Sequence, residues 1–130
     1  MVNAIIIGHG SFAQAMLKTA EAIVGEQENV EVVSNKGFSC EQLGHEIERR
    51  CHNREHNTIV FLDLPGGSCT ISCYNVLKEH PDMNVISGVN LPLLIEFFML
   101  RNKYSAGELV PLLVKKGKDN IIHLRCRDEG

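Results

Sequence analysis

Residues 2–11 read VNAIIIGHGS, and this stretch decides the fold class. The continuous apolar run over residues 2–8 is typical of a strand buried on both faces of a parallel sheet. Apolar residues at helical spacing follow over residues 11–24, and Gly25 supplies a C-terminal stop. A strand that leads directly into a helix predicts a βα unit, with His9 at the joint.

The same alternation of β-like runs and helical patterns continues along the chain. Further strands are predicted at residues 30–34, 58–64 and 83–87. Helices are predicted from the N-cap Ser39 to about residue 51, from the turn at 66–68 to about residue 79, and at residues 91–101 and 106–116. Ser39 and Gln42 have the spacing of a capping box. Residues 121–124 are a candidate last strand, at an edge or exchanged with a partner copy. We therefore expect an α/β fold: an open, mainly parallel sheet of order 2-1-3-4, with helices on both faces and possibly an antiparallel edge strand.

Composition indicates an ordinary globular domain. The 130 residues, 44% hydrophobic and 22% charged, fit a single domain over residues 1–130 with a charged tail at 125–130. A net charge of −3 argues against nucleic-acid binding, and an aromatic content of 5% without Trp argues against lectins and single-strand binders. The sequence predicts no membrane insertion and no signal peptide. Its five cysteines lack a CxxC pair, which favours reduced thiols and a cytoplasmic location.

His9 and Asp63 are the candidate catalytic pair. Each is expected at the carboxyl end of a strand, and the first and third strands are neighbours in the predicted order, so the two side chains can meet at one edge of the sheet. A carboxylate that accepts a hydrogen bond from one ring nitrogen fixes the tautomer and leaves the other nitrogen free as a nucleophile. The alternatives are a turn histidine without chemistry and Asp63 as an N-cap.

The run Gly66-Gly67-Ser68 forms a second candidate element of the site, directly after Asp63. Backbone N–H groups at the start of the following helix, together with the Ser68 hydroxyl, suit the oxygens of an anion. Ser68 as a simple N-cap is the ordinary alternative, and both roles are compatible.

Four segments together resemble the enzyme IIA domain of the mannose family of the bacterial phosphotransferase system (PTS), which takes up sugars with phosphoenolpyruvate. They are IIIGHGSFAQ at 5–14, LKTAEAIVGEQENV at 17–30, FLDLPGGS at 61–68 and VISGVNLPLLIE at 85–96. The resemblance implies that His9 is the phosphorylated histidine, that Asp63 orients it and that Ser68 lies in the same pocket. It also implies a phosphocarrier that accepts a phosphoryl group from HPr and passes it to a IIB component, without a cofactor and as a homodimer.

Some features leave alternatives open. Cys69 stands where a proline commonly follows the GGS element of the family. The sequence ends without a IIB domain, so a separate IIB protein is expected. The family is also similar to the phosphoryl-donor subunit of dihydroxyacetone kinase, although the GGS element favours the sugar-transport branch. A regulatory domain that is phosphorylated without feeding a transporter is a further alternative.

Other candidate residues receive ordinary interpretations. His52 and His56 have the spacing of two zinc ligands on one helical turn, but a solvated surface is favoured. His45, His80 and His123 have no evident partners. Cys69 and Cys73 are expected to be buried small side chains, and Lys115, Lys116 and Lys118 a solvated helix end.

Overall fold

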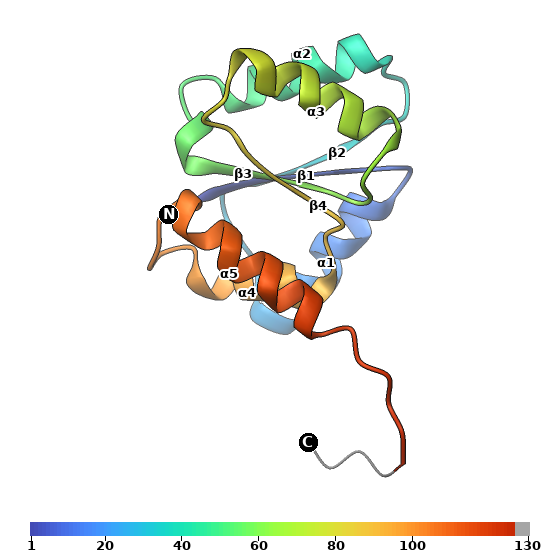
Figure 1. The fold of residues 1–130 in the computed structure, drawn as a ribbon, viewed down its shortest axis with the longest axis vertical. Coiled ribbons are helices and arrows are strands. Elements are labelled where there is room, and N and C mark those ends of the chain that lie inside the picture. The colour runs from blue at the N-terminus through green and yellow to red at the C-terminus, as the bar shows by residue number, and fades with distance from the viewer. Residues whose placement is uncertain (127–130) are drawn as a thin grey trace.

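The computed structural model describes residues 1–126, in which strands and helices alternate as the sequence predicts (Figure 1). The strands are β1 (Asn3–Gly8), β2 (Val30–Ser34), β3 (Thr58–Leu62) and β4 (Asn84–Ser87). The helices are α1 (Phe12–Val24), α2 (Cys40–Cys51), α3 (Gly67–Glu79), α4 (Leu91–Leu100) and α5 (Ala106–Asp119), with the short 3-10 helix η1 (Glu55–Asn57) before β3.

The four strands form one sheet of order β2-β1-β3-β4, and all three pairings are parallel. Helices α2 and α3 cover one face of the sheet, and α1, α4 and α5 cover the other (Figure 1). The predicted strand order and the helices on both faces are therefore confirmed. After β1 the chain continues to β2 on one side of the sheet, and after β3 it continues to β4 on the other side. The switch point of the sheet therefore lies between the carboxyl ends of β1 and β3.

Each face of the sheet has its own apolar core. Successive side chains of a strand point to opposite faces, so Ile6 of β1 packs with Phe61 and Phe97 on the α4 side, whereas Ile7 packs with Leu62 on the α2 side. The sheet thus separates two buried clusters. All residues of β3 are buried, as predicted for a central strand.

A capping box starts one helix on each face of the sheet. The Ser39 Oγ accepts the Gln42 backbone N–H at 3.1 Å, and the Gln42 Oε1 accepts the Ser39 N–H at 2.9 Å, which confirms the capping box at the start of α2. Ser105 and Glu108 form a second box at α5 that the sequence analysis did not identify. Reciprocal caps satisfy N–H groups that the first helical turn cannot pair.

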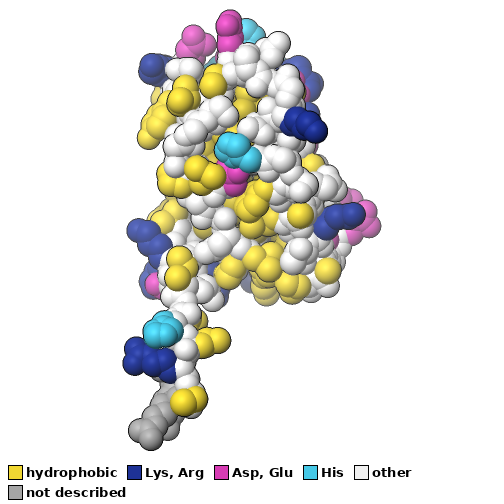
Figure 2. All heavy atoms as spheres, turned by 90° about the vertical axis from the view of Figure 1, so that its right-hand side faces the viewer, with side chains coloured by type: hydrophobic (Ala, Val, Ile, Leu, Met, Phe, Trp, Pro, Cys, Tyr) yellow, Lys and Arg dark blue, Asp and Glu magenta, His cyan; other side chains and the backbone are white. Residues whose placement is uncertain are grey.

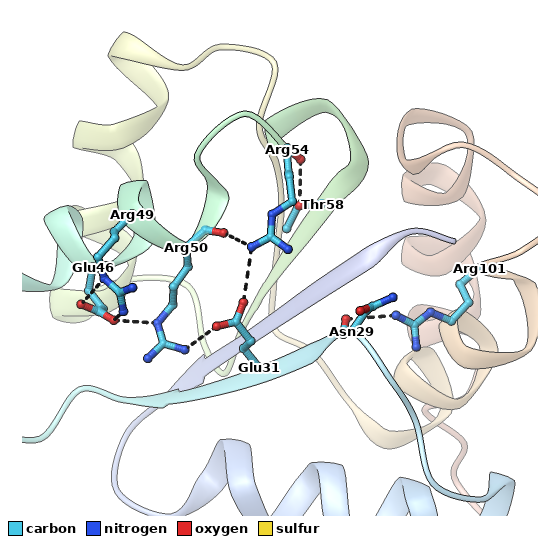
Figure 3. A network of polar contacts seen from close by, with 8 residues as sticks. All are labelled: Asn29, Glu31, Glu46, Arg49, Arg50, Arg54, Thr58 and Arg101. Atoms are coloured by element: carbon cyan, nitrogen blue, oxygen red, sulfur yellow. Dashed lines mark hydrogen bonds and ion pairs between the residues drawn. The ribbon is translucent and has the colours of Figure 1, made fainter.

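A buried arginine ties the opposite end of the sheet together. The Arg101 side chain is 1% exposed and donates to the backbone oxygens of Val2 and Asn29, while the ring of Phe97 lies 5.0 Å from its guanidinium carbon. Figure 3 shows the contact of Arg101 with Asn29 beside a separate network in which Arg50 joins Glu31 to Glu46. Burial lowers the pKa of Arg101, although backbone oxygens and the Gln27 side-chain oxygen accept its hydrogen bonds.

Residues 121–124 form no edge strand of this chain's own sheet, so that part of the prediction is wrong, whereas exchange with a partner copy stays a prediction. The segment forms no strand and no antiparallel edge exists within residues 1–126. It leaves the body after α5 (Figure 1), and hydrophobic side chains are visible along it in Figure 2. Ile121 and Leu124 are 80% and 81% exposed, because a strand needs a neighbour and none lies beside this segment. Of the expected charged tail, residues 127–130 lie outside the described part.

Within residues 1–126, no helix combines the length and the apolar character needed to cross a membrane.

Candidate functional site

His9 lies at the switch point of the sheet, between the last residue of β1 and the first turn of α1. Its side chain is 44% exposed. A Cβ at Gly8 would lie 2.8 Å from Phe12 Cδ1 and 3.2 Å from Asp63 Oδ2, so a larger residue there would force these side chains to shift. Glycine thus allows the close approach of Asp63 to the backbone before His9.

Asp63 holds His9 through two hydrogen bonds. Its Oδ2 lies 2.8 Å from the His9 backbone N–H and 2.8 Å from the ring Nδ1, and its Oδ1 accepts the Leu64 N–H at 2.9 Å. The Asp63 side chain is only 7% exposed. The predicted meeting of the two residues is confirmed.

The charge state of Asp63 determines which ring nitrogen carries the proton. Partial burial alone would raise the pKa of Asp63, but the hydrogen bonds from the His9 N–H, the His9 ring and the Leu64 N–H outweigh it and hold the pKa below its ordinary value. An ionised carboxylate only accepts hydrogen bonds, so Nδ1 carries the proton. In the neutral ring Nε2 then keeps a free lone pair.

The glycine turn after Asp63 brings α3 against the His9 ring. Gly67, with φ of +77°, is the first residue of α3, and a Cβ there would lie 3.8 Å from His9 Cε1 and 3.9 Å from Nε2. The first N–H groups of a helix have no partner within it and carry a partial positive charge. The free nitrogen of His9 therefore faces the start of a helix that favours anions.

Neither Asp63 nor Ser68 caps α3, so these two alternative interpretations are wrong. The N-cap is Gly66, without a side-chain hydrogen bond. Ser68 lies one residue beyond Gly67 and is half-buried, and its backbone oxygen accepts the Ser72 hydroxyl at 2.8 Å. Within residues 1–126 its own hydroxyl makes no hydrogen bond to His9 or Asp63.

Thr70 closes the glycine turn and was missed by the sequence analysis. Its Oγ1 accepts the Gly66 N–H at 3.0 Å and donates to the Leu64 backbone oxygen at 3.2 Å. The hydroxyl therefore bridges both sides of the turn that holds Gly67 beside His9. Threonine near a helix start is a general signal for such local bonds, but the signal does not specify the partners.

The other candidate histidines lie away from the switch point. His52 and His56 are exposed and do not share a helix, because α2 ends at Cys51 and His56 belongs to η1. His80, for which no partner was evident, lies 3.0 Å from Glu48 and 3.7 Å from Glu55, so that expectation is wrong. These partners belong to other elements.

The remaining cysteines and lysines behave largely as expected. Cys69 and Cys73 are buried free thiols, which confirms the prediction. Lys115 pairs with Asp119 within α5, and Lys116 pairs with Glu96 of α4 at 3.1 Å.

The fold and site define an open parallel α/β domain with a histidine–aspartate pair at its switch point. A model of the family described as "PTS system fructose IIA component" matches residues 3–114, and the chain belongs to this family, the mannose-family IIA components of the sugar phosphotransferase system.

Known relatives cover most of the chain. It is 33% identical over 132 residues to the PTS system mannose-specific EIIAB component of Escherichia coli, covering 98% of this chain and 41% of that protein. The chain thus spans about two fifths of the length of that relative. It is 29% identical to the PTS system fructose-specific EIIA component of Bacillus subtilis, over 85% of this chain and 77% of the relative. The crystal structure of EIIA from Streptococcus agalactiae superposes with a TM-score of 0.85 at 27% identity, covering 95% and 97% of the two chains.

Proposed function

We propose that the protein is a phosphohistidine carrier, in which His9 accepts a phosphoryl group from phospho-HPr and passes it to a IIB component. The observation that carries the proposal is the 2.8 Å contact between His9 Nδ1 and Asp63 Oδ2, which leaves Nε2 as the nucleophile. In the transfer, the Nε2 lone pair forms a bond to phosphorus while the bond from phosphorus to the donor's imidazole nitrogen breaks. The donor nitrogen recovers the electron pair.

Charge around the site supports both directions of transfer. Asp63 accepts the hydrogen bond from Nδ1–H throughout, so its carboxylate stabilises the positive charge that develops on the ring when Nε2 is phosphorylated. The N-terminus of α3 beside Gly67 favours the phosphoryl oxygens. The side chain of His9 is exposed enough for a protein donor and a protein acceptor to reach it in turn. We place the relay in the cytoplasm, and the reaction itself needs no cofactor.

The direct test is incubation with phosphoenolpyruvate, enzyme I and HPr, followed by mapping of the labelled residue by mass spectrometry. We expect one phosphoryl group, on His9, and none on the His9→Ala variant. His52→Ala is the matched control, because His52 is exposed but far from the switch point, and it should accept label normally. A label on His52, His80 or another histidine would overturn the assignment.

Onward transfer to a purified IIB protein separates the relay from the regulatory alternative. A carrier should transfer its phosphoryl group to IIB at least as fast as it accepts one from HPr. A regulatory domain keeps the label, and that result would contradict the proposed transport role.

We also propose that the protein forms a homodimer through the segment after α5. Strand β4 lies at an edge of the sheet, and edge strands present unpaired backbone groups. Ile122 and Leu124 are 64% and 81% exposed, and a second copy offers them an edge to pair with. Sedimentation equilibrium should show a dimer for the natural protein and for Ile23→Asp, an exposed control on α1, and a monomer for Ile122→Asp/Leu124→Asp. A natural protein that is monomeric would refute the dimer.

A further inference from the structure

Three potential metal ligands of different chemistry converge beneath the exposed ring of His9. One ligand atom each from His9, Asp63 and Cys69 lies within 4.8 Å of those of the other two. Cys69 is a free thiol in the first turn of α3 and is 0% exposed. His9 follows β1, Asp63 follows β3 and Cys69 lies in the first turn of α3. Each segment that forms the switch point therefore contributes one ligand.

We propose that His9, Asp63 and Cys69 bind a divalent transition metal, with Zn²⁺ as the best match, and that the bound metal blocks phosphorylation. Imidazole nitrogen, carboxylate oxygen and thiolate sulfur are the ligands that zinc uses, and three protein ligands leave a fourth position for water. The exposed side of His9 gives the ion a path of entry. The blocking role rests on the proposed function, whereas the metal site does not.

The charges in the cluster select the kind of metal. Within residues 1–124, no lysine or arginine forms an ion pair with Asp63, whose ion-pair partner there is His9. Burial and then the charge of Asp63 raise the pKa of the Cys69 thiol, and a metal dication offsets both effects. The N-terminus of α3 opposes any cation, so we expect binding by a metal with strong bonds to sulfur and nitrogen, not by Mg²⁺ or Ca²⁺.

Metal binding at Nδ1 and phosphoryl transfer at Nε2 require different protonation states of the same His9 ring. His9 Nδ1, which faces Asp63 at 2.8 Å, must lose its proton to bind the metal, and the Cys69 thiol must lose one as well. Both protons go to solvent. The transfer described above needs Nδ1 protonated and bonded to the Asp63 carboxylate, so one imidazole cannot serve both states. By linkage, phosphorylation must weaken metal binding as much as the metal weakens phosphorylation.

A second group in the same chain provides an internal control. Glu48, Glu79 and His80 also bring ligand atoms within 4.8 Å of one another, but this group contains no sulfur. A metal bound there would differ spectroscopically from one bound to Cys69.

The experiment uses the purified, fully reduced chain, titrated with CoCl₂ and ZnCl₂ in the absence of HPr. Binding to Cys69 should give a sulfur-to-cobalt charge-transfer absorption in the near ultraviolet, which Zn²⁺ removes. Chelator competition should give a Zn²⁺ affinity that falls by about 100-fold or more in Cys69→Ala and in Asp63→Asn. The matched control is Cys73→Ala, one helical turn further on and equally buried, which should keep the absorption.

Phosphorylation by HPr is then measured with Zn²⁺ and with chelator. The ratio of the two rates should be large for the natural protein and for Cys73→Ala, and near one for Cys69→Ala. Absence of the charge-transfer band, or a band that survives in Cys69→Ala, would overturn the metal site. So would Zn²⁺ affinity that is lost in His80→Asn instead. A chain that binds Co²⁺ through Cys69 but is never labelled by HPr would refute the proposed function and leave the metal site standing.

Discussion

Gly67 lies against the imidazole of His9, so closely that a Cβ on it would be 3.8 Å from Cε1 and 3.9 Å from Nε2. This contact places the start of α3 at the nitrogen that is free to react. In the proposed relay, a side chain at Gly67 would crowd the space beside Nε2 where we expect the phosphoryl group.

Gly67→Ala should therefore slow phosphorylation by about 10-fold or more while costing only about 1–2 kcal/mol of stability for its left-handed backbone. Stopped-flow transfer from HPr and chemical denaturation measure the two effects. Gly25→Ala is the control, because Gly25 has φ of +92° at the far end of α1, where nothing lies within 4 Å. If phosphorylation slowed equally in Gly67→Ala and Gly25→Ala, backbone strain alone would explain the loss, and crowding of His9 would be refuted.

Asp63→Asn should fold but transfer the phosphoryl group about 10²-fold or more slowly, because a neutral amide no longer enforces the Nδ1–H tautomer. Nitrogen chemical shifts of His9 should show a larger share of the Nε2–H tautomer in this variant. A normal rate in a thermally intact Asp63→Asn protein would remove Asp63 from the mechanism.

The lowered pKa of Asp63 predicts a specific acid sensitivity. Its contribution to the free energy of unfolding is present above the unfolded pKa of about 3.9 and is lost as the pH falls through the lower folded value. Urea unfolding from pH 7 to pH 2 measures the free energy of unfolding of the natural protein and of Asp63→Asn. The difference between the two should decrease only below about pH 4. Glu46 and Glu108, whose pKa values are also lowered, are present in both proteins and cancel in the difference. An advantage that is independent of pH would contradict this linkage.

Thr70 is expected to position the glycine turn through its hydroxyl. Thr70→Val keeps the shape but removes both bonds of the hydroxyl, so transfer should fall by about 10-fold, while Thr70→Ser should restore it. Hydrogen exchange at the Gly66 amide should accelerate in Thr70→Val alone. If Thr70→Val transferred the phosphoryl group at the normal rate although its Gly66 amide exchanged faster, Thr70 would not be needed to position the turn.

Ser68→Ala should reduce transfer by less than about 10²-fold, the usual loss for one donor in a rigid, dry site. The backbone donors of α3 remain whatever side chain follows Gly67, and the structure shows no bond from the Ser68 hydroxyl to His9. Rates from HPr and to IIB decide: unchanged rates in both directions remove Ser68 from the site, and abolished transfer makes it central.

The fold was predictable wherever a local pattern is strong. The β-branched run of β1 and the capping box at Ser39 act within a few residues, so their elements were predicted almost to the residue. The third strand was predicted two residues too long. It ends at Leu62, because Asp63 turns its carboxylate to the N–H groups of His9 and Leu64.

Long-range partners were not predictable in the same way. The meeting of His9 and Asp63 followed from the strand order, which places both at one edge. The partners of His80 come from α2 and η1, and Arg101 reaches backbone oxygens up to 99 residues away. No spacing in the sequence encodes such contacts. Residues 121–124 form no strand in the sheet of their own chain, because strand pairing depends on a neighbour that the local sequence does not specify.

The two separate apolar cores give the candidate site a mechanical property. The His9 turn leads into α1, which packs in one core, whereas Gly67 and Cys69 belong to α3, which packs in the other. The nucleophile and the helix start that faces it are thus anchored in different layers, joined across the sheet by Asp63. A relative shift of the two helical layers would therefore change the spacing between Nε2 and Gly67.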